Sequence, residues 1–314
     1  MTTDAQLTCP DGTPISEFCF GTMQFGVADQ AESQAMFEAC RGAGINFFDT
    51  AYIYTNGDSE KWLGGMIQTE RDRLYIASKV AYKDGAGQGA ITAQMDESRQ
   101  RLQLDTVDAY YLHRWDPKTP LEETFETLAE LKSRGWFRDI GVSNFAAWQV
   151  MKAVRVAARF DLTIKLLQPM YNLVKRQAEV ELLPMAADQD IAVMPYSPLG
   201  GGLLTGKYQQ GETGRLSTNR MYAARYSDPW MHETAGAFVK LATEAGMAPA
   251  TLAVAWVAAQ PGVTAPIISA RTVSQLGPSL DAMSLEVSAD LMAQVTALSR
   301  TPPPATDRSE EADA

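Results

Sequence analysis

Short apolar runs recur along this chain, and most are separated by stretches with the spacing of an amphipathic helix. Eight of the runs are apolar on both faces, which is the pattern of a strand buried between a core and covering helices. The predicted strands are Phe18–Gly21, Asn46–Asp49, Leu74–Lys79, Asp108–His113, Ile140–Ser143, Lys165–Pro169, Ala192–Tyr196 and Ala265–Ser269.

Helical patterns lie between these runs, and glycine stops two of them, at Gly42 and Gly135. The predicted helices are Ala31–Arg41, Ala90–Leu102, Leu121–Ser133, Ala178–Gln189 and Ala250–Ala259. Alternating strands and helices indicate a parallel sheet, and eight repeats indicate closure into a (β/α)8 (TIM) barrel of the α/β class. We expect residues 1–300 to form this single domain.

Three segments lie outside the repeat. Residues 7–15 read as a β-hairpin around the turn Asp11-Gly12, which we expect to plug the N-terminal end of the barrel. Residues 206–228 are rich in Gly, Ser and Arg without a clean period, as in a functional or disordered loop. Residues 301–314 begin with prolines and continue with acidic and small residues, which predicts a disordered acidic tail.

Composition excludes several classes of protein. The chain has 314 residues, 46% of them hydrophobic, which suffices for a large core. Its net charge of -11 argues against nucleic-acid or membrane-surface binding, since phosphate groups require Lys and Arg. Cys9, Cys19 and Cys40 lack metal-ligand spacing, so we expect buried thiols and no metal site. No signal peptide or membrane-spanning run is recognisable, and a cytoplasmic location is expected.

Candidate chemistry gathers at the predicted strand ends. Asp49 ends one strand and Tyr54 lies in the loop after it, while Lys79 and His113 end the next two strands. Side chains at the C-terminal ends of parallel barrel strands converge on one face. A tyrosine normally keeps its proton until about pH 10, and a neighbouring lysine cation lowers that pKa by stabilising the phenolate. Together these side chains suit proton donation to a carbonyl oxygen.

Each of these residues alone has a simpler structural interpretation. An Asp at a strand end often caps a helix, a loop Tyr can be a packed aromatic, and a Lys can be a surface charge. One of only two histidines in the chain can equally be structural. The four in this order, on three successive strand ends, favour a catalytic cluster.

The set resembles the catalytic tetrad of the aldo-keto reductases, and the resemblance extends from about Leu7 to about Leu298. It is strongest in Asp49-Thr50-Ala51-x-x-Tyr54. The resemblance implies that Tyr54 is the general acid, that Lys79 tunes its pKa and that Asp49 anchors the lysine. His113 would orient the substrate carbonyl or relay a proton.

The resemblance also implies a nicotinamide cofactor site along the remaining strand ends. Tyr196 would stack on the ring, Ser143, Asn144 and Gln168 would hold its carboxamide, and a glycine-rich loop would wrap the pyrophosphate. The implied cofactor residues are Gly21, Thr22, Met23, Asp49, Ser143, Asn144, Gln168, Tyr196, Ser197, Pro198, Leu199, Gly202, Leu203, Lys207, Arg215, Ser269, Arg271, Gln275 and Ser279. Gly-x-Gly-x-x-Gly is missing after the first strand, so a Rossmann site is not supported.

Arg271 stands where the family binds the adenosine 2′-phosphate, at a helix start that suits an anion. Arg271 favours NADP(H), whereas Ser279, which replaces the family's usual Asn, leaves NAD(H) possible. The surrounding motifs are similar to the aflatoxin-aldehyde-reductase branch and its bacterial relatives. In that branch the substrate would meet Met23, Tyr54, His113, Tyr222 and Arg225.

The sequence thus predicts an NADP(H)-dependent oxidoreductase that reduces small aldehydes or ketones, as a monomer or a homo-oligomer. Two alternatives stay open. One is an NAD(P)-dependent sugar or alcohol dehydrogenase working in the oxidative direction, because hydride transfer is reversible. The other is a cofactor-bound regulatory subunit with little turnover, like the potassium-channel β subunits.

Overall fold

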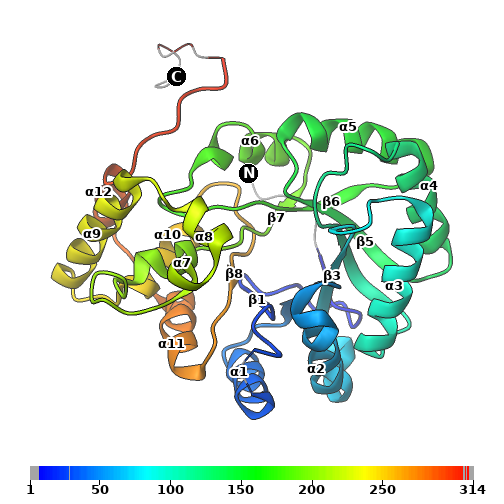
Figure 1. The fold of residues 1–314 in the computed structure, drawn as a ribbon, viewed down its shortest axis with the longest axis horizontal. Coiled ribbons are helices and arrows are strands. Elements are labelled where there is room, and N and C mark those ends of the chain that lie inside the picture. Colours follow the sequence, from blue (N-terminus) through cyan, green and yellow to red (C-terminus); the bar gives the residue numbers. More distant parts are fainter. Residues whose placement is uncertain (1–6, 28, 307, 309, 311–314) are drawn as a thin grey trace.

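Parallel strands curl around a common axis in the computed structural model, which describes residues 7–27, 29–306, 308 and 310 (Figure 1). Within these residues eight strands form one sheet. They are β1 (Cys19–Gly21), β2 (Phe47–Asp49), β3 (Tyr75–Val80), β4 (Val107–Leu112), β5 (Phe137–Ser143), β6 (Ile164–Gln168), β7 (Ala192–Val193) and β8 (Ile267–Ile268).

The sheet follows the chain order β1 to β7, and β8 pairs with β1. Its two ends meet through a parallel bridge between Tyr196 and Ile267, where the Ile267 amide donates to the Pro195 carbonyl at 2.8 Å. The predicted parallel (β/α)8 arrangement is therefore confirmed. β7 and β8 are shorter than the five-residue runs in the sequence, because only part of each run pairs with its neighbours.

Helices alternate with the strands and cover the outside of the sheet (Figure 1). They are α1 (Gln30–Gly42), α2 (Asp58–Ile67), α3 (Gln88–Leu102), α4 (Leu121–Ser133), α5 (Ala147–Ala157), α6 (Leu182–Asp188), α7 (Arg215–Thr218), α8 (Arg220–Arg225), α9 (Pro229–Glu244), α10 (Pro249–Ala258), α11 (Val273–Asp281) and α12 (Ala289–Ala297). Short 3-10 turns include Tyr54–Gly57 and Gly200–Thr205.

Local sequence explains several helix starts. The Asp29 and Ser288 side chains cap α1 and α12 by accepting from backbone amides of the first turn, and α9 and α10 each begin at a proline. The helix predicted over Ala178–Gln189 is divided into a 3-10 turn at Gln177–Glu179 and α6. Pro184 has no amide hydrogen, so it fits the first turn of α6 and not the interior of a longer helix.

Residues 206–228 are not irregular throughout, because they contain α7 and α8. The Asn219 side chain caps α8 by accepting from the amides of Met221 and Tyr222. A side-chain cap can start a short helix that has no amphipathic pattern. Hydrophobic periodicity therefore did not predict α8.

The N-terminal segment forms an antiparallel bridge between Thr8 and Pro14, with Gly12 at a φ of 89° in the turn. Leu7 and Cys9 pack with the apolar side chains inside the barrel. A plugging role for this hairpin stays a prediction. The C-terminal segment after α12 extends away from the barrel (Figure 1). Its predicted disorder is untested, and residues 1–6, 28, 307, 309 and 311–314 lie outside the described part of the chain.

No single helix among the described residues is long and apolar enough to cross a membrane; α9 and α10 meet that criterion only jointly, with a 103° bend between them. Cys9, Cys19 and Cys40 are buried free thiols, as predicted.

Candidate active site

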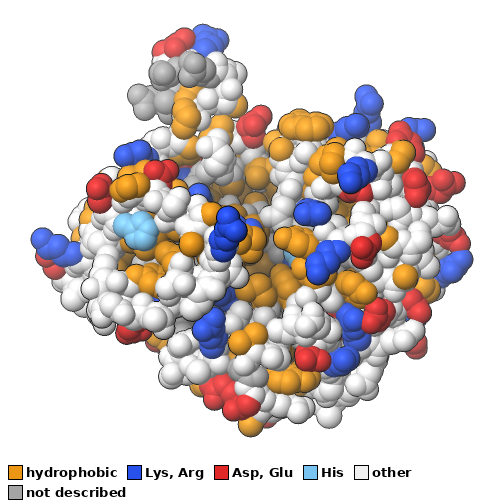
Figure 2. Space-filling view, in the orientation of Figure 1, with side chains coloured by type: hydrophobic (Ala, Val, Ile, Leu, Met, Phe, Trp, Pro, Cys, Tyr) orange, Lys and Arg blue, Asp and Glu red, His pale blue; other side chains and the backbone are white. Residues whose placement is uncertain are grey.

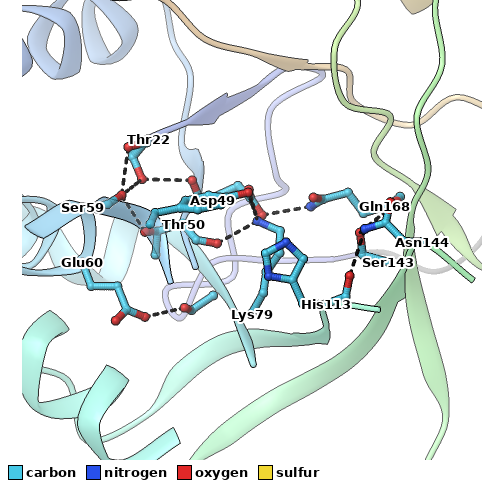
Figure 3. A network of polar contacts seen from close by, with 12 residues as sticks. Thr22, Asp49, Thr50, Ser59, Glu60, Lys79, His113, Ser143, Asn144 and Gln168 are labelled. Atoms are coloured by element: carbon cyan, nitrogen blue, oxygen red, sulfur yellow. Dashed lines mark hydrogen bonds and ion pairs between the residues drawn. The ribbon is translucent and has the colours of Figure 1, made fainter. Parts of the chain in front are cut away.

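The ends of β2, β3 and β4 bring Asp49, Lys79 and His113 together (Figure 3). Strand register causes this convergence, because Asp49 pairs with Ala77 and Lys79 pairs with Tyr111 across the sheet. Tyr54 joins them from the turn after β2, and its hydroxyl lies 3.3 Å from Lys79 Nζ. The four residues proposed from sequence therefore form one cluster.

A buried ion pair stands at the centre of the cluster. Lys79 donates to a carboxylate oxygen of Asp49, and both residues are nearly inaccessible, at 1% and 2% exposure. Lys79 also donates to the Thr50 carbonyl at 2.7 Å, and Gln168 donates to the second Asp49 oxygen at 2.9 Å. Burial lowers the pKa of Lys79, but Asp49 and Tyr54 outweigh it, so the pKa is raised and the cation persists.

The pKa of the Tyr54 phenol is raised above its ordinary value by burial, while the Lys79 cation acts in the opposite direction. The Lys79 cation thus acts to lower the pKa of the phenol, as the sequence led us to expect, but burial raises this pKa by more. The phenol is therefore protonated at neutral pH and faces a cation that stabilises its phenolate.

His113 is held as a neutral imidazole. Burial lowers its pKa to about 2, and the Lys79 and Arg114 cations contribute. Its ring lies 5.9 Å from the Tyr54 ring and 4.8 Å from the Tyr82 ring, centroid to centroid. Nδ1 is buried without a hydrogen-bond partner among the described residues. Such a neutral ring can donate one hydrogen bond to a carbonyl oxygen without adding charge.

Three hydroxyl groups support this cluster, and of these the sequence had not singled out Ser59 (Figure 3). Ser59 Oγ lies 2.8 Å from the hydroxyls of both Thr22 and Thr50, and Thr22 also donates to the Asp49 carbonyl at 3.1 Å. These contacts join α2 to the ends of β1 and β2. Tyr82, three residues after Lys79, was also missed; its position just past a strand end was the available signal.

Amide and hydroxyl side chains follow the tetrad around the strand ends. We call this group the amide shelf; it consists of Ser143, Asn144, Gln168 and Tyr196. Asn144 adopts a left-handed φ of 59°, donates to the His113 carbonyl at 2.9 Å, and accepts from the Tyr196 hydroxyl at 2.7 Å. Ser143 Oγ donates to the Gln168 carbonyl at 2.9 Å. The predicted carboxamide-binding residues and Tyr196 therefore lie beside the tetrad.

A cation cluster lies in the loops after β7 and β8. Burial lowers the pKa of Lys207, and the nearby cations of Arg271 and Arg215 lower it further. The backbone approaches Lys207 closely, since a Cβ on Gly202 would lie 2.6 Å from its Cε and one on Gly214 would lie 2.5 Å from its Nζ. Three cations and close backbone approach are the features of a polyanion site.

The start of α11 carries further predicted cofactor residues. Arg271 is exposed and its Nε donates to Gln24 at 3.1 Å, while Gln275 accepts from the Arg271 amide at 3.3 Å. Ser269 Oγ is buried without a hydrogen-bond partner among the described residues. Ser279 is buried within α11, at 1% exposure. The unpartnered hydroxyl, together with Lys207, Arg215 and Arg271, which form no ion pair with a carboxylate among the described residues, fits a phosphorylated cofactor.

The other predicted cofactor residues also lie at or after the C-terminal ends of strands. Gly21, Thr22 and Met23 lie at the end of β1, and the remaining residues follow β7: Ser197, Pro198, Leu199 and Leu203. Figure 2 shows a hollow near the centre of one face, with apolar side chains inside it and Lys and Arg side chains around it.

The predicted substrate residues from α8 adjoin this region. The Tyr222 side chain is buried, and the guanidinium carbons of Arg215 and Arg225 each lie 5.3 Å from its ring centre. Burial raises the pKa of Tyr196 to about 12, and the Arg225 cation acts in the opposite direction. α8 therefore places Tyr222 and Arg225 near Tyr196. No cluster of three or more His, Cys, Asp or Glu side chains in the described part of the chain is arranged to hold a metal ion.

Comparison with known proteins matches this sequence to a family. Residues 17–300 match the model of the aldo/keto reductase family. The chain is 34% identical over 275 residues to the aldo-keto reductase YhdN of Bacillus subtilis, covering 83% of this chain and 82% of the relative. It is also 34% identical over 218 residues to aflatoxin B1 aldehyde reductase member 2 of Rattus norvegicus, covering 67% of this chain and 59% of the relative.

A third relative carries a different description. The chain is 32% identical over 295 residues to a probable voltage-gated potassium channel subunit beta of Arabidopsis thaliana, covering 87% of this chain and 89% of the relative.

Proposed function

Because this chain belongs to the aldo/keto reductase family, we propose that it is an NADP(H)-dependent oxidoreductase that reduces aldehydes or ketones to alcohols, with Tyr54 as the general acid. The observation that carries the proposal is the buried cluster in which the Lys79 ammonium lies between the Asp49 carboxylate and the Tyr54 hydroxyl. The proposed location is the cytoplasm.

Each of the four residues in the cluster has one role in the proposed reaction. Tyr54 holds a proton on its hydroxyl, 3.3 Å from a cation that stabilises the phenolate as the proton leaves. Asp49 keeps Lys79 charged and fixed in a site where an unpaired ammonium would lose its proton. His113, neutral and next to the Tyr54 ring, donates to the substrate oxygen and orients the carbonyl.

The amide shelf and the cluster of Lys207, Arg215 and Arg271 would hold the cofactor. Tyr196, Asn144 and Gln168 would hold the nicotinamide end, and Lys207, Arg215 and Arg271 would bind the phosphates. When bound, NADPH supplies the hydride. Arg271 supports the 2′-phosphorylated cofactor over NAD(H), because this exposed cation immediately precedes the N-cap of α11. Ser269, two positions earlier, has a buried hydroxyl without a partner among the described residues.

The first test is turnover and its dependence on Tyr54. NADPH oxidation with 4-nitrobenzaldehyde, followed by absorbance at 340 nm, should continue far beyond one equivalent per chain. Tyr54→Phe should lower the rate by about 100- to 10,000-fold, the usual contribution of general acid catalysis. NADPH affinity, measured by protein fluorescence, should change little. A variant that keeps more than about half of a chemistry-limited rate would refute the role of Tyr54.

A regulatory subunit is the second candidate, favoured by the similarity to the probable channel β subunit of Arabidopsis thaliana. It requires tight cofactor binding with little turnover. NADPH binding without oxidation across a panel of aldehydes and ketones would support this alternative. NADP+ reduction in the presence of sugars or alcohols, at a higher rate than carbonyl reduction, would instead indicate a dehydrogenase.

A further inference from the structure

Arg101 joins the outer helix α3 to the loop that carries Tyr54, although it touches none of the four tetrad residues. Its NH1 donates to the Tyr52 carbonyl at 2.9 Å and to Glu60 at 3.2 Å, and its NH2 donates to Glu97. The guanidinium carbon lies 4.6 Å from the Tyr52 ring centre. Both terminal nitrogens of this side chain are therefore engaged, and NH1 and the guanidinium face contact the loop between β2 and α2.

That loop has a backbone that needs support. Thr55, Asn56 and Gly57 follow Tyr54 with left-handed φ values of 45°, 54° and 94°. Non-glycine residues in this region cost about 1–3 kcal/mol each and persist where surrounding contacts hold them. Arg101 lies directly against Gly57, where an added Cβ would be 2.5 Å from the guanidinium carbon. The guanidinium thus braces the loop on both sides of Tyr54.

The same guanidinium reaches the strand that carries Lys79. It pairs with the fully buried Glu60 carboxylate. Glu60, which is labelled in Figure 3, accepts a hydrogen bond from Ser78, the residue immediately before Lys79. Tyr52 is tied to that strand as well, since its amide donates to the Lys79 carbonyl at 3.0 Å. Arg101 therefore contacts the segment that bears the proton donor directly, and it reaches the strand that bears the cation through Glu60.

We propose that Arg101 is a positioning residue that sets the distance between the Tyr54 hydroxyl and the Lys79 ammonium. This inference rests on the proposed role of Tyr54 as general acid. The planar fork of arginine contacts a carbonyl, a carboxylate and a ring at once, whereas a lysine ammonium satisfies one of these partners. A displacement of about 1 Å in a catalytic group can lower the rate about 100-fold.

The test compares two arginines of the same helix. Arg101→Lys keeps a positive charge for Glu60, which protects folding, but loses the fork. Arg99→Lys is the matched control: Arg99 has a side chain 18% exposed against 14% for Arg101, and its guanidinium carbon lies 4.5 Å from the Trp136 ring. Arg99 pairs with Asp96 and Asp105 and has no contact with the Tyr54 loop among the described residues.

Under saturating NADPH, Arg101→Lys should lower kcat about 10- to 100-fold while the Kd for NADPH changes less than about twofold. Arg99→Lys should keep kcat within about twofold. In a Tyr54→Phe background, Arg101→Lys should lower the residual rate by less than about twofold, because the group that it positions is already gone.

Either of two results with the lysine variants would overturn the inference. One is equal kcat values for Arg101→Lys and Arg99→Lys. The other is the same fold-loss from Arg101→Lys in both backgrounds, which indicates a general structural effect. Failure of the proposed function is a separate outcome, because it appears as an unimpaired Tyr54→Phe single variant. Arg101→Gln, measured in parallel, extends the series, and a kcat at the Arg99→Lys level there would also reject the positioning role.

Discussion

At the scale of single residues, burial is the largest influence on the protonation of the site. It raises the pKa of Tyr54 and of Asp49, and it lowers that of His113. The Lys79 cation opposes burial at the first two groups and reinforces it at the third. The combined result is a protonated phenol beside a neutral imidazole, which suits proton donation to a neutral carbonyl.

The low pKa of His113 predicts a pH dependence of stability. In the unfolded chain a histidine takes up a proton below about pH 6.5, whereas buried His113 stays neutral down to about pH 2. The unfolded state then binds more protons, so the free energy of unfolding falls as pH drops below 6.5, by about 1.4 kcal/mol per pH unit from this group. Urea unfolding between pH 7 and 5 measures the slope.

His113→Gln should remove that contribution, so the difference between wild type and variant should shrink as pH falls. His232→Gln, a substitution of the chain's other histidine that leaves His113 in place, should retain the slope. Parallel pH dependences for wild type and His113→Gln would contradict a neutral buried imidazole.

At the scale of elements, the site depends on close contact between α2 and α3. Gly64 in α2 faces the C-terminal backbone of α3, and a Cβ there would lie 2.7 Å from the carbonyl oxygens of Arg101 and Leu102. Backbone atoms cannot rotate away as a flexible side chain can. Neighbouring Gly65 has open space, with nothing within 4 Å of an added Cβ.

This contrast predicts opposite effects for two adjacent substitutions. Gly64→Ala should lower the free energy of unfolding by about 1–3 kcal/mol, the usual range for overpacking. Gly65→Ala should raise it by up to about 1 kcal/mol, because alanine favours a helix interior more than glycine does. Thermal and urea unfolding compare the two. Equal changes in the two variants would mean that α2 and α3 are not packed as described.

At the scale of the whole molecule, the net charge opposes binding of an anionic cofactor, whereas one cluster of cations favours it. The chain has a net charge of -11, yet Lys207, Arg215 and Arg271 lie close enough together to lower the pKa of Lys207 beyond the effect of burial. A local excess of cations in an acidic protein marks where an anion gains most from binding.

Arg271 should therefore distinguish the two cofactors. Arg271→Ala should weaken NADPH binding by about 10- to 150-fold, the equivalent of one charge-assisted hydrogen bond of roughly 1.5–3 kcal/mol, and leave NADH binding nearly unchanged. Because Arg271 is exposed, the wild-type preference for NADPH should shrink as salt rises. Fluorescence titrations with both cofactors measure this. Equal losses would assign Arg271 a general loop role, and equal wild-type affinities would refute the NADP(H) preference.

The sequence by itself determined the repeat of buried strands and helices, because hydrophobic periodicity is a local property of each segment. It also gave the order of Asp49, Tyr54, Lys79 and His113 at successive strand ends, since a parallel sheet places all those ends on one face. Helix boundaries were predicted well where glycine or helical spacing marks them, as in α4, whose bounds match the sequence prediction.

Only the tertiary structure decided what depends on distance between remote segments. Tyr52 and Arg101 are 49 positions apart, and nothing in either segment indicates that they touch. The net pKa shift of Tyr54 likewise follows from how deeply the folded chain buries it, which no local pattern records. Short helices such as α8 escape periodicity, because a capping side chain rather than an apolar face starts them.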